Sequence, residues 1–214
     1  MKIGTLHVLT DVALQSRFSH VELTRLAIAG GADTIQFRQK IGSTRELIDM
    51  ACQMKRLCED AGVSFIVNDR VDVALAAEAH GVHLGQDDFP IPLARKLLGP
   101  DRIIGGSASD LDEARICLSE GADYVGFGPV FPTTSKDDAG PVSGIAMLKE
   151  VVDIIPLPII AIGGITVENA WEVMETGAGG IAVISAVCCQ KDPTAETKAL
   201  KEALLKGKTE DHHA

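Results

Sequence analysis

The chain has 214 residues, of which 46% are hydrophobic, and this length suits one α/β barrel at the compact end of its range. A formal net charge of −10 disfavours nucleic acid and anionic membranes as partners, although a local group of Arg and Lys can still bind a phosphorylated metabolite. Since no stretch approaches the roughly 20 apolar residues that span a bilayer, and the amino terminus lacks the regions of a signal peptide, we expect a soluble cytoplasmic protein.

Short apolar runs alternate with helix-compatible segments along the whole chain. The runs predict strands near residues 5–10, 33–38, 63–67, 81–84, 102–106, 123–127, 157–162 and 180–184. The intervening segments predict helices near residues 20–30, 44–61, 71–79, 90–98, 110–120, 143–153, 166–176 and 193–206. A strand followed by a helix in every unit calls for a parallel sheet with right-handed crossovers.

Eight such units favour closure into a single parallel (β/α)8 TIM barrel over residues 1–206, with residues 207–214 as a disordered tail. A doubly wound open sheet is the alternative, because alternation alone does not reveal the order of the strands. In a barrel the loops that follow the strands open on one face, and that face carries the chemistry.

Gln36, Arg38 and Lys40 alternate along the end of the second predicted strand. Period-two geometry places their side chains on one side, toward the barrel interior or its mouth. Two cations and an amide are costly there unless an anion meets them, and the forked guanidinium suits phosphate oxygens. A salt-bridge network with Asp or Glu is the alternative.

Carboxylates follow the next two strands. Asn68 and Asp69 end the third, and Asp87 and Asp88 come after the fourth. Mg²⁺ is usually held by one or two carboxylates together with substrate phosphate and water, so Asp69 with Asp88 is the preferred metal pair and Asp87 the reserve. In the alternative interpretation, Asp87 or Asp88 only caps the helix that starts near Pro90.

The last two strands end in segments typical of a phosphate site. Gly163-Gly164-Ile165 follows the seventh, and Ile184-Ser185-Ala186 ends the eighth. Backbone N–H groups after strands seven and eight of such barrels often bind phosphate, and glycine lets the backbone approach the anion. A tight turn without a ligand is the alternative.

The connection from Gly128 to Gly144 is far longer than the roughly two to six residues usual after a strand. Long loops in compact domains are commonly lids or binding loops. Thr133, Ser135 and Lys136 offer hydroxyls and an ammonium that can close over a phosphorylated substrate, while a passive surface excursion is the alternative.

The chain lacks a G-x-S-x-G elbow, a P-loop and a G-x-G-x-x-G fingerprint, and nothing in it suggests a covalent nucleophile. His83 lies inside a predicted strand, which favours a packed histidine over a general base.

Six segments occur together in this order: IQFRQK, NDR, HLGQDD, GADYVGFGPVFPTTSK, AIGGI and VISA. With them the chain resembles the thiamine phosphate synthase family, within the wider group that includes the thiazole tautomerases, from HVLTD (7–11) through the last helix. The resemblance implies a compact α/β barrel transferase. Such enzymes join hydroxymethylpyrimidine diphosphate to hydroxyethylthiazole phosphate and release pyrophosphate, with Mg²⁺.

The resemblance also assigns roles to residues. It implies that the pyrimidine diphosphate is held by Gln36, Arg38, Lys40 and Asn68, and Mg²⁺ by Asp69 and Asp88. It places Ser107 and Lys136 near the departing pyrophosphate, so the implied catalytic residues are Lys136, Ser107 and Arg38. It implies that the thiazole phosphate is held by Thr133, Ser135 and the backbone of Gly163, Ile184 and Ser185.

The implied chemistry is dissociative. Departure of the diphosphate leaves a pyrimidine-stabilised cation that the thiazole nitrogen captures, so positioning and charge neutralisation replace a protein nucleophile.

Two differences from the family pattern concern how the substrates are held. Ser109 stands where many relatives carry a histidine, and Thr134-Ser135 replaces a more usual threonine-rich run.

Two other functions are weighed against this one. A thiazole tautomerase has no use for a metal–diphosphate cradle, and its acid–base histidine has no obvious match here. A non-catalytic barrel that binds phosphorylated thiazole or thiamine belongs to a different class, and turnover with purified substrates separates all three.

The expected partners are the phosphorylated pyrimidine and thiazole substrates, without nucleic acid or membrane, and a homodimer is an open alternative.

Overall fold

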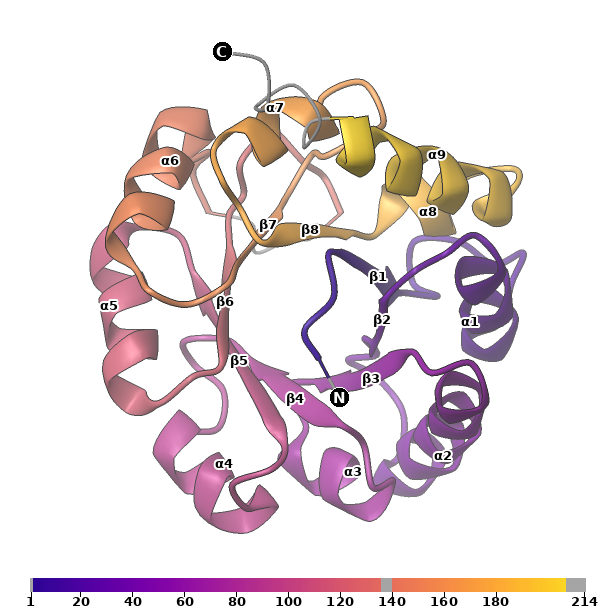
Figure 1. Ribbon diagram of the computed structural model, residues 1–214. Helices are drawn as coiled ribbons and strands as arrows, with labels where there is room; N and C mark the ends of the chain where they lie inside the picture. Colours follow the sequence, from indigo (N-terminus) through magenta and orange to yellow (C-terminus); the bar gives the residue numbers. More distant parts are fainter. Residues whose placement is uncertain (1, 136–139, 207–214) are drawn as a thin grey trace.

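The computed structural model describes residues 2–135 and 140–206 and forms a closed barrel of eight parallel strands in the order β1 to β8 (Figure 1). The strands are β1 (Leu6–Thr10), β2 (Thr34–Phe37), β3 (Ser64–Asn68), β4 (Gly81–Leu84), β5 (Ile103–Ala108), β6 (Tyr124–Phe127), β7 (Ile159–Ile162) and β8 (Gly180–Val183). Pairing of β1 with β8 closes the barrel, with Leu6 opposite Ile181. The predicted TIM barrel is confirmed, and the open-sheet alternative is wrong.

Helices surround the barrel as an outer ring (Figure 1). They are α1 (His20–Ala29), α2 (Thr44–Asp60), α3 (Val71–Ala76), α4 (Ile91–Leu98), α5 (Leu111–Glu120), α6 (Gly144–Ile154), α7 (Ala170–Glu175), α8 (Ser185–Cys188) and α9 (Pro193–Lys206). Capping boxes start α1 and α2, where the side chains of Ser19 and Ser43 accept hydrogen bonds from the backbone N–H of Glu22 and Glu46.

Two helix boundaries and one extra helix differ from the prediction. α7 begins at Ala170 because Asn169 first closes a turn, accepting from Thr166 N at 2.8 Å and donating to Gly164 O at 3.0 Å. α3 stops at Ala76 because the chain turns there, with Glu78 in the left-handed region at φ 50°. The four-residue α8 was not expected.

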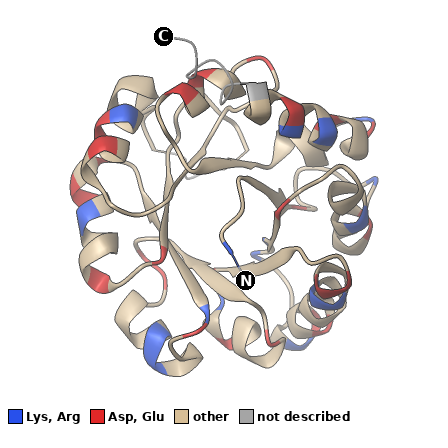
Figure 2. Cartoon of the chain, viewed as in Figure 1, with Lys and Arg blue, Asp and Glu red and all other residues tan. Residues whose placement is uncertain are grey.

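Apolar side chains form two cores. A large core lies between the strands and the helices, and a smaller one inside the barrel contains Leu9, Ile66, Ile103, Tyr124, Ile160, Ala182 and Ile184. On β1, Leu6 and Val8 belong to the outer core and Leu9 to the inner one. Most charged residues lie on the outer helices and the loops (Figure 2).

The first described residues lie across the end of the barrel where the strands begin, inside the ring in Figure 1. Ile3 packs against the inner core, and Ser64 Oγ donates to Lys2 O at 2.9 Å. At the same end, Asp33 pairs with Lys201 and accepts from Leu6 N at 3.0 Å. The amino end is therefore filled, which leaves the opposite end for a site.

No helix in the described ranges has the length and apolar character needed to cross a membrane. The tail 207–214 and Lys136 lie outside the described residues.

Candidate active site

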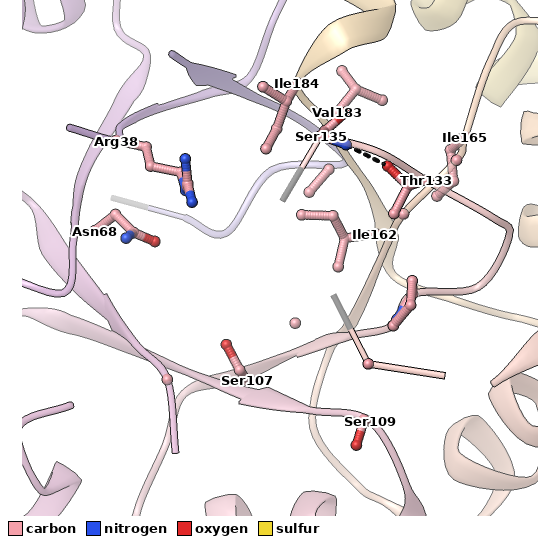
Figure 3. Close-up of a pocket in the computed structure, with 18 of the residues that line it drawn as sticks. Arg38, Asn68, Ser107, Ser109, Thr133, Ser135, Ile162, Ile165, Val183 and Ile184 are labelled. Carbon is pink, nitrogen blue, oxygen red and sulfur yellow. Dashed lines mark hydrogen bonds between the residues drawn. The ribbon is translucent and has the colours of Figure 1, made fainter. Parts of the chain in front are cut away.

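A cavity of about 490 Å³ opens at the carboxyl ends of the strands (Figure 3). The residues predicted for the site that line it are Arg38, Lys40, Asn68, Asp69, Asp88, Ser107, Thr133, Ser135, Gly163, Ile184 and Ser185. In Figure 3, Arg38 and Asn68 lie on one side of the cavity, and Thr133, Ser135 and Ile165 on the other. The cavity thus has a charged side and a side of hydroxyls and apolar groups.

Gln36 on β2, and Arg38 and Lys40 just after it, lie at different depths in the barrel. Gln36 is 4% exposed, does not line the cavity, and its Oε1 accepts no hydrogen bond from the described residues. Arg38 and Lys40 line the cavity, with side chains 12% and 52% exposed. Inward side chains stack in layers in a barrel, so the deeper Gln36 is covered by the layer above it.

Both cations face carboxylates, as the salt-bridge alternative expected. Arg38 Nη1 pairs with Asp11 Oδ2, and Lys40 Nζ lies 3.5 Å from Asp69 Oδ2. Asp11 was not among the predicted site residues, although it follows β1 at the same end of the barrel. Its position at the carboxyl end of a strand was the available signal.

Asp69 and Asp88 lie next to each other at the ends of β3 and β4. Asp69 has φ 63°, and its N–H donates to His83 O at 2.8 Å. Asp88 Oδ2 accepts from Gly85 N at 2.7 Å. The N-cap residue of α4 is Pro90, whose side chain makes no capping hydrogen bond, and Asp88 accepts from Gly85 N, so the alternative that Asp87 or Asp88 is the cap is wrong.

Burial, then a hydrogen bond to Asp88 and the charge of Asp88, raise the pKa of Asp69 to about 6, while Lys40 lowers it. Two charged carboxylates held this close repel each other, and a shared proton or a cation between them relieves the repulsion. Among the described residues, no group of three or more His, Cys, Asp or Glu side chains is placed to hold a metal ion. Two carboxylates plus ligands from substrate and water are the donor set that Mg²⁺ usually takes, so the residues present fit that ion.

Ser107 on β5 lines the cavity, and His83 holds its hydroxyl in place. His83 Nε2 lies 3.0 Å from Ser107 Oγ, and His83 Nδ1 lies 2.9 Å from Tyr124 Oη. A Cβ on Gly105 would lie 2.2 Å from Tyr124 Cζ, and one on Gly126 would lie 2.8 Å from His83 Cε1, so both glycines make room for the pair. His83 is the packed histidine expected, and in addition it orients a cavity hydroxyl.

The glycines after β7 are required by packing. Gly163 and Gly164 have φ 100° and 64°, and a Cβ on Gly164 would lie 2.5 Å from Pro132 O. The facing segment pairs with them, since Phe131 N donates to Gly163 O at 3.0 Å. The loop is therefore a tight turn, and it also lines the cavity. Phosphate binding by its backbone stays a prediction.

The connection from Gly128 to Gly144 is anchored at both ends. Val130 N donates to Ile162 O at 2.9 Å, and Ser143 donates from N to Pro129 O at 2.9 Å and from Oγ to Ser109 O at 2.7 Å. Toward the middle, Ser135 Oγ donates to Ser185 Oγ at 2.8 Å. Residues 136–139 lie outside the described ranges, so the expected lid stays a prediction.

The lining residues that were not predicted include three with long polar side chains. Gln86 Nε2 donates to Ser107 O at 2.7 Å, and Gln190 Nε2 to Ser185 O at 3.3 Å. Glu113 accepts from Ser109 N at 2.7 Å and from Ser109 Oγ at 2.9 Å. The serine at position 109 therefore has a partner of its own.

A closed (β/α)8 barrel with a polar cavity at the carboxyl ends of its strands defines the class of TIM-barrel enzymes. A family model described as thiamine monophosphate synthase matches residues 6–187. The chain belongs to this family.

Individual relatives agree with the family model. A thiamine-phosphate synthase from Salinibacter ruber is 51% identical, with 94% of this chain and 89% of that protein covered. One from Methanocella arvoryzae is 52% identical, with 92% of each covered. A solved structure of thiamine phosphate pyrophosphorylase from Pyrococcus furiosus superposes with a TM-score of 0.87 at 41% identity, over 95% of this chain and 96% of that one.

Proposed function

We propose that the chain is a transferase that condenses hydroxymethylpyrimidine diphosphate with hydroxyethylthiazole phosphate to give thiamine phosphate and pyrophosphate. The observation that carries this proposal is the meeting of Arg38, Lys40, Asp69 and Asp88 in one cavity, in a chain of the thiamine monophosphate synthase family. Cations beside paired carboxylates suit a diphosphate that arrives with a divalent metal ion.

The charged side of the cavity holds the pyrimidine diphosphate. Arg38 and Lys40 supply donors to the phosphate oxygens, and Asn68 supplies an amide beside them. Gln36 lies one layer deeper, outside the cavity lining, and its predicted contact with the diphosphate stays a prediction. Ser107, held by His83, is placed to bond the departing group, and Lys136 is proposed to act with it.

Asp69 and Asp88 would hold Mg²⁺, with substrate oxygens and water as the remaining ligands. When bound, the ion neutralises charge on the diphosphate and makes it a better leaving group. Lys40, which lies 3.5 Å from Asp69, adds positive charge at the same place. The chain's own residues therefore position the diphosphate and stabilise its departure.

The opposite side of the cavity holds the thiazole phosphate. Ser135 and Ser185 bring two hydroxyls within 2.8 Å of each other, beside Thr133 and the backbone of Gly163 and Ile184. Apolar side chains such as Ile162 and Ile165 lie near them and exclude water. Water exclusion matters because the cation left by diphosphate departure must meet the thiazole nitrogen before it meets water.

No observation favours the other two functions. The relatives reported above are named as synthases, and the carboxylate pair with Arg38 and Lys40 has no use in a thiazole tautomerase. A barrel that only binds phosphorylated thiazole or thiamine does not need the diphosphate side.

The test is turnover by the purified chain with both phosphorylated substrates and Mg²⁺. We expect thiamine phosphate and pyrophosphate in equal amounts, and neither when one substrate or the metal ion is omitted. Heat-inactivated protein gives the background rate. Absence of product with both substrates and Mg²⁺ present would rule the proposal out.

A further inference from the structure

Asp11 lies at the carboxyl end of β1, just outside the cavity. Its side chain is 4% exposed, and that of its partner Arg38 is 12% exposed. Asp11 Oδ1 accepts from Ala13 N at 2.8 Å, which fixes the carboxylate in a turn after the strand. The other oxygen, Oδ2, faces Arg38 Nη1.

Arg38 is tied to β1 in two places. Its backbone N–H donates to Thr10 O at 3.2 Å, and its guanidinium pairs with Asp11. Thr10 itself is held by His20, whose Nδ1 lies 2.7 Å from Thr10 Oγ1. The end of β1 therefore holds both the backbone and the guanidinium of the residue that directly follows β2.

We infer that Asp11 is a positioning residue that holds the Arg38 guanidinium in place for the pyrimidine diphosphate. This inference depends on the proposed function. A guanidinium has five N–H donors in a planar fork, so one bond to Asp11 leaves further donors for phosphate oxygens. A long side chain without such an anchor loses rotamer freedom at the moment of binding, which weakens binding.

A purely structural role makes a different prediction. The loss of one partner from a buried ion pair destabilises the fold wherever the pair lies. Asp33 offers a control away from the site, because it also pairs with a cation and accepts a backbone N–H, but at the amino end of the barrel and with its side chain 32% exposed. Loss of stability is expected from both Asp11→Asn and Asp33→Asn. A change in substrate binding is expected from Asp11→Asn alone.

The experiment measures KM for each substrate, kcat and the thermal midpoint. For Asp11→Asn we expect KM for the pyrimidine diphosphate to rise by about tenfold or more, with KM for the thiazole phosphate unchanged. For Asp33→Asn we expect a lower midpoint and both KM values unchanged. If Asp11→Asn does not fold, Asp11→Glu decides, because it keeps the charge but displaces Arg38 and should raise the same KM.

A double-mutant cycle separates this inference from the proposed function. If Asp11 acts through Arg38, then adding Asp11→Asn to Arg38→Gln raises the diphosphate KM no further. If Arg38→Gln raises that KM but Asp11→Asn leaves it unchanged or lowers it, the positioning role is overturned and the proposed function stands. If Arg38→Gln itself has no effect, the proposed binding of the diphosphate by Arg38 fails.

Discussion

Arg38 combines near-complete burial with a position in the cavity wall, so its shape matters as well as its charge. Arg38→Lys keeps the charge but replaces a planar fork by a point charge. We expect kcat/KM for the pyrimidine diphosphate to fall by about 10- to 100-fold, the equivalent of one or two charge-assisted hydrogen bonds. The exposed Arg25 on α1 provides the control, since Arg25→Lys should leave the kinetics at wild-type values.

The carboxylate pair allows a test of which acidic residues hold the metal ion. We expect Asp69→Ala and Asp88→Ala each to lower turnover by about 100-fold or more at ordinary Mg²⁺, because each removes a proposed ligand. Asp87→Ala is the matched control, since Asp87 lines the same cavity but is not one of the proposed pair. Steady-state rates across a Mg²⁺ titration measure the effect. Equal losses in all three variants would contradict the assignment.

Single residues were predictable where strand periodicity fixes direction. Arg38 was predicted to reach the cavity in this way, and it does. Asp69 was predicted because neighbouring strands end at the same face, and Ser107 only through the family resemblance; both line the cavity. The partnership of Asp11 with Arg38 was not predictable, because it depends on how β1 and β2 lie side by side in register. Gln36 was placed on the correct side of the strand, but its depth depends on how the barrel layers stack.

At the scale of elements, the loop after β7 has a conformation that two glycines make possible. We expect Gly164→Ala to lower both stability and activity. A Cβ there would lie 2.5 Å from Pro132 O and 2.7 Å from Phe131 Cβ, so the segment that carries Thr133 must move. Thermal denaturation and the condensation assay measure the two effects.

The control for this variant is Gly62→Ala. Gly62 has φ 69°, close to the 64° of Gly164, but a Cβ there meets nothing within 4 Å. Both variants therefore share the cost of a left-handed alanine, about 1–2 kcal/mol, and only Gly164→Ala adds the collision. Equal losses in stability and activity would show that backbone conformation alone explains the effect.

Most elements were predictable from the alternation of apolar runs and helix-compatible segments, and the boundaries that were wrong have local causes. α8 has four residues, too few to show a helical period. α7 starts late because Asn169 uses its side chain to close the preceding turn, a hydrogen bond that propensity alone does not reveal.

At the scale of the whole molecule, two buried histidines link stability to pH. Burial lowers the pKa of His7 and of His20 from 6.5 to about 4. A hydrogen bond to Gly4 O opposes this shift for His7, and the charge of Asp11 opposes it for His20. Above pH 6.5 both are neutral in the folded and unfolded chain. Between pH 6.5 and 4 the unfolded chain takes up protons that the folded chain does not, so stability falls as the pH falls.

We expect each histidine to contribute up to about 3 kcal/mol to this loss. The free energy of unfolding, measured by denaturant titration from pH 7 to pH 4, should decrease more steeply for the wild-type chain than for His20→Asn, which cannot take up the proton. Carboxylates titrate in the same range in both proteins, so the comparison isolates the histidine. Parallel curves would contradict this origin.

Closure of the barrel was expected from eight repeating units, but it depends on contacts between the two ends of the chain. Leu6 and His7 on β1 lie opposite Ile181 and Ala182 on β8. The proposed metal pair is likewise a consequence of the fold, because β3 and β4 bring Asp69 beside Asp88. Sequence patterns predict the strands, and only the closed ring determines which strand ends become neighbours.

The segment that fills the amino end also determines where molecules can enter and leave the barrel. Ile3 and the backbone of Lys2 occupy that end, and the cavity opens at the other. Both substrates must therefore enter, and both products leave, through the same opening. With the two substrates bound on opposite sides of this one cavity, a product that stays bound keeps the next pair of substrates out.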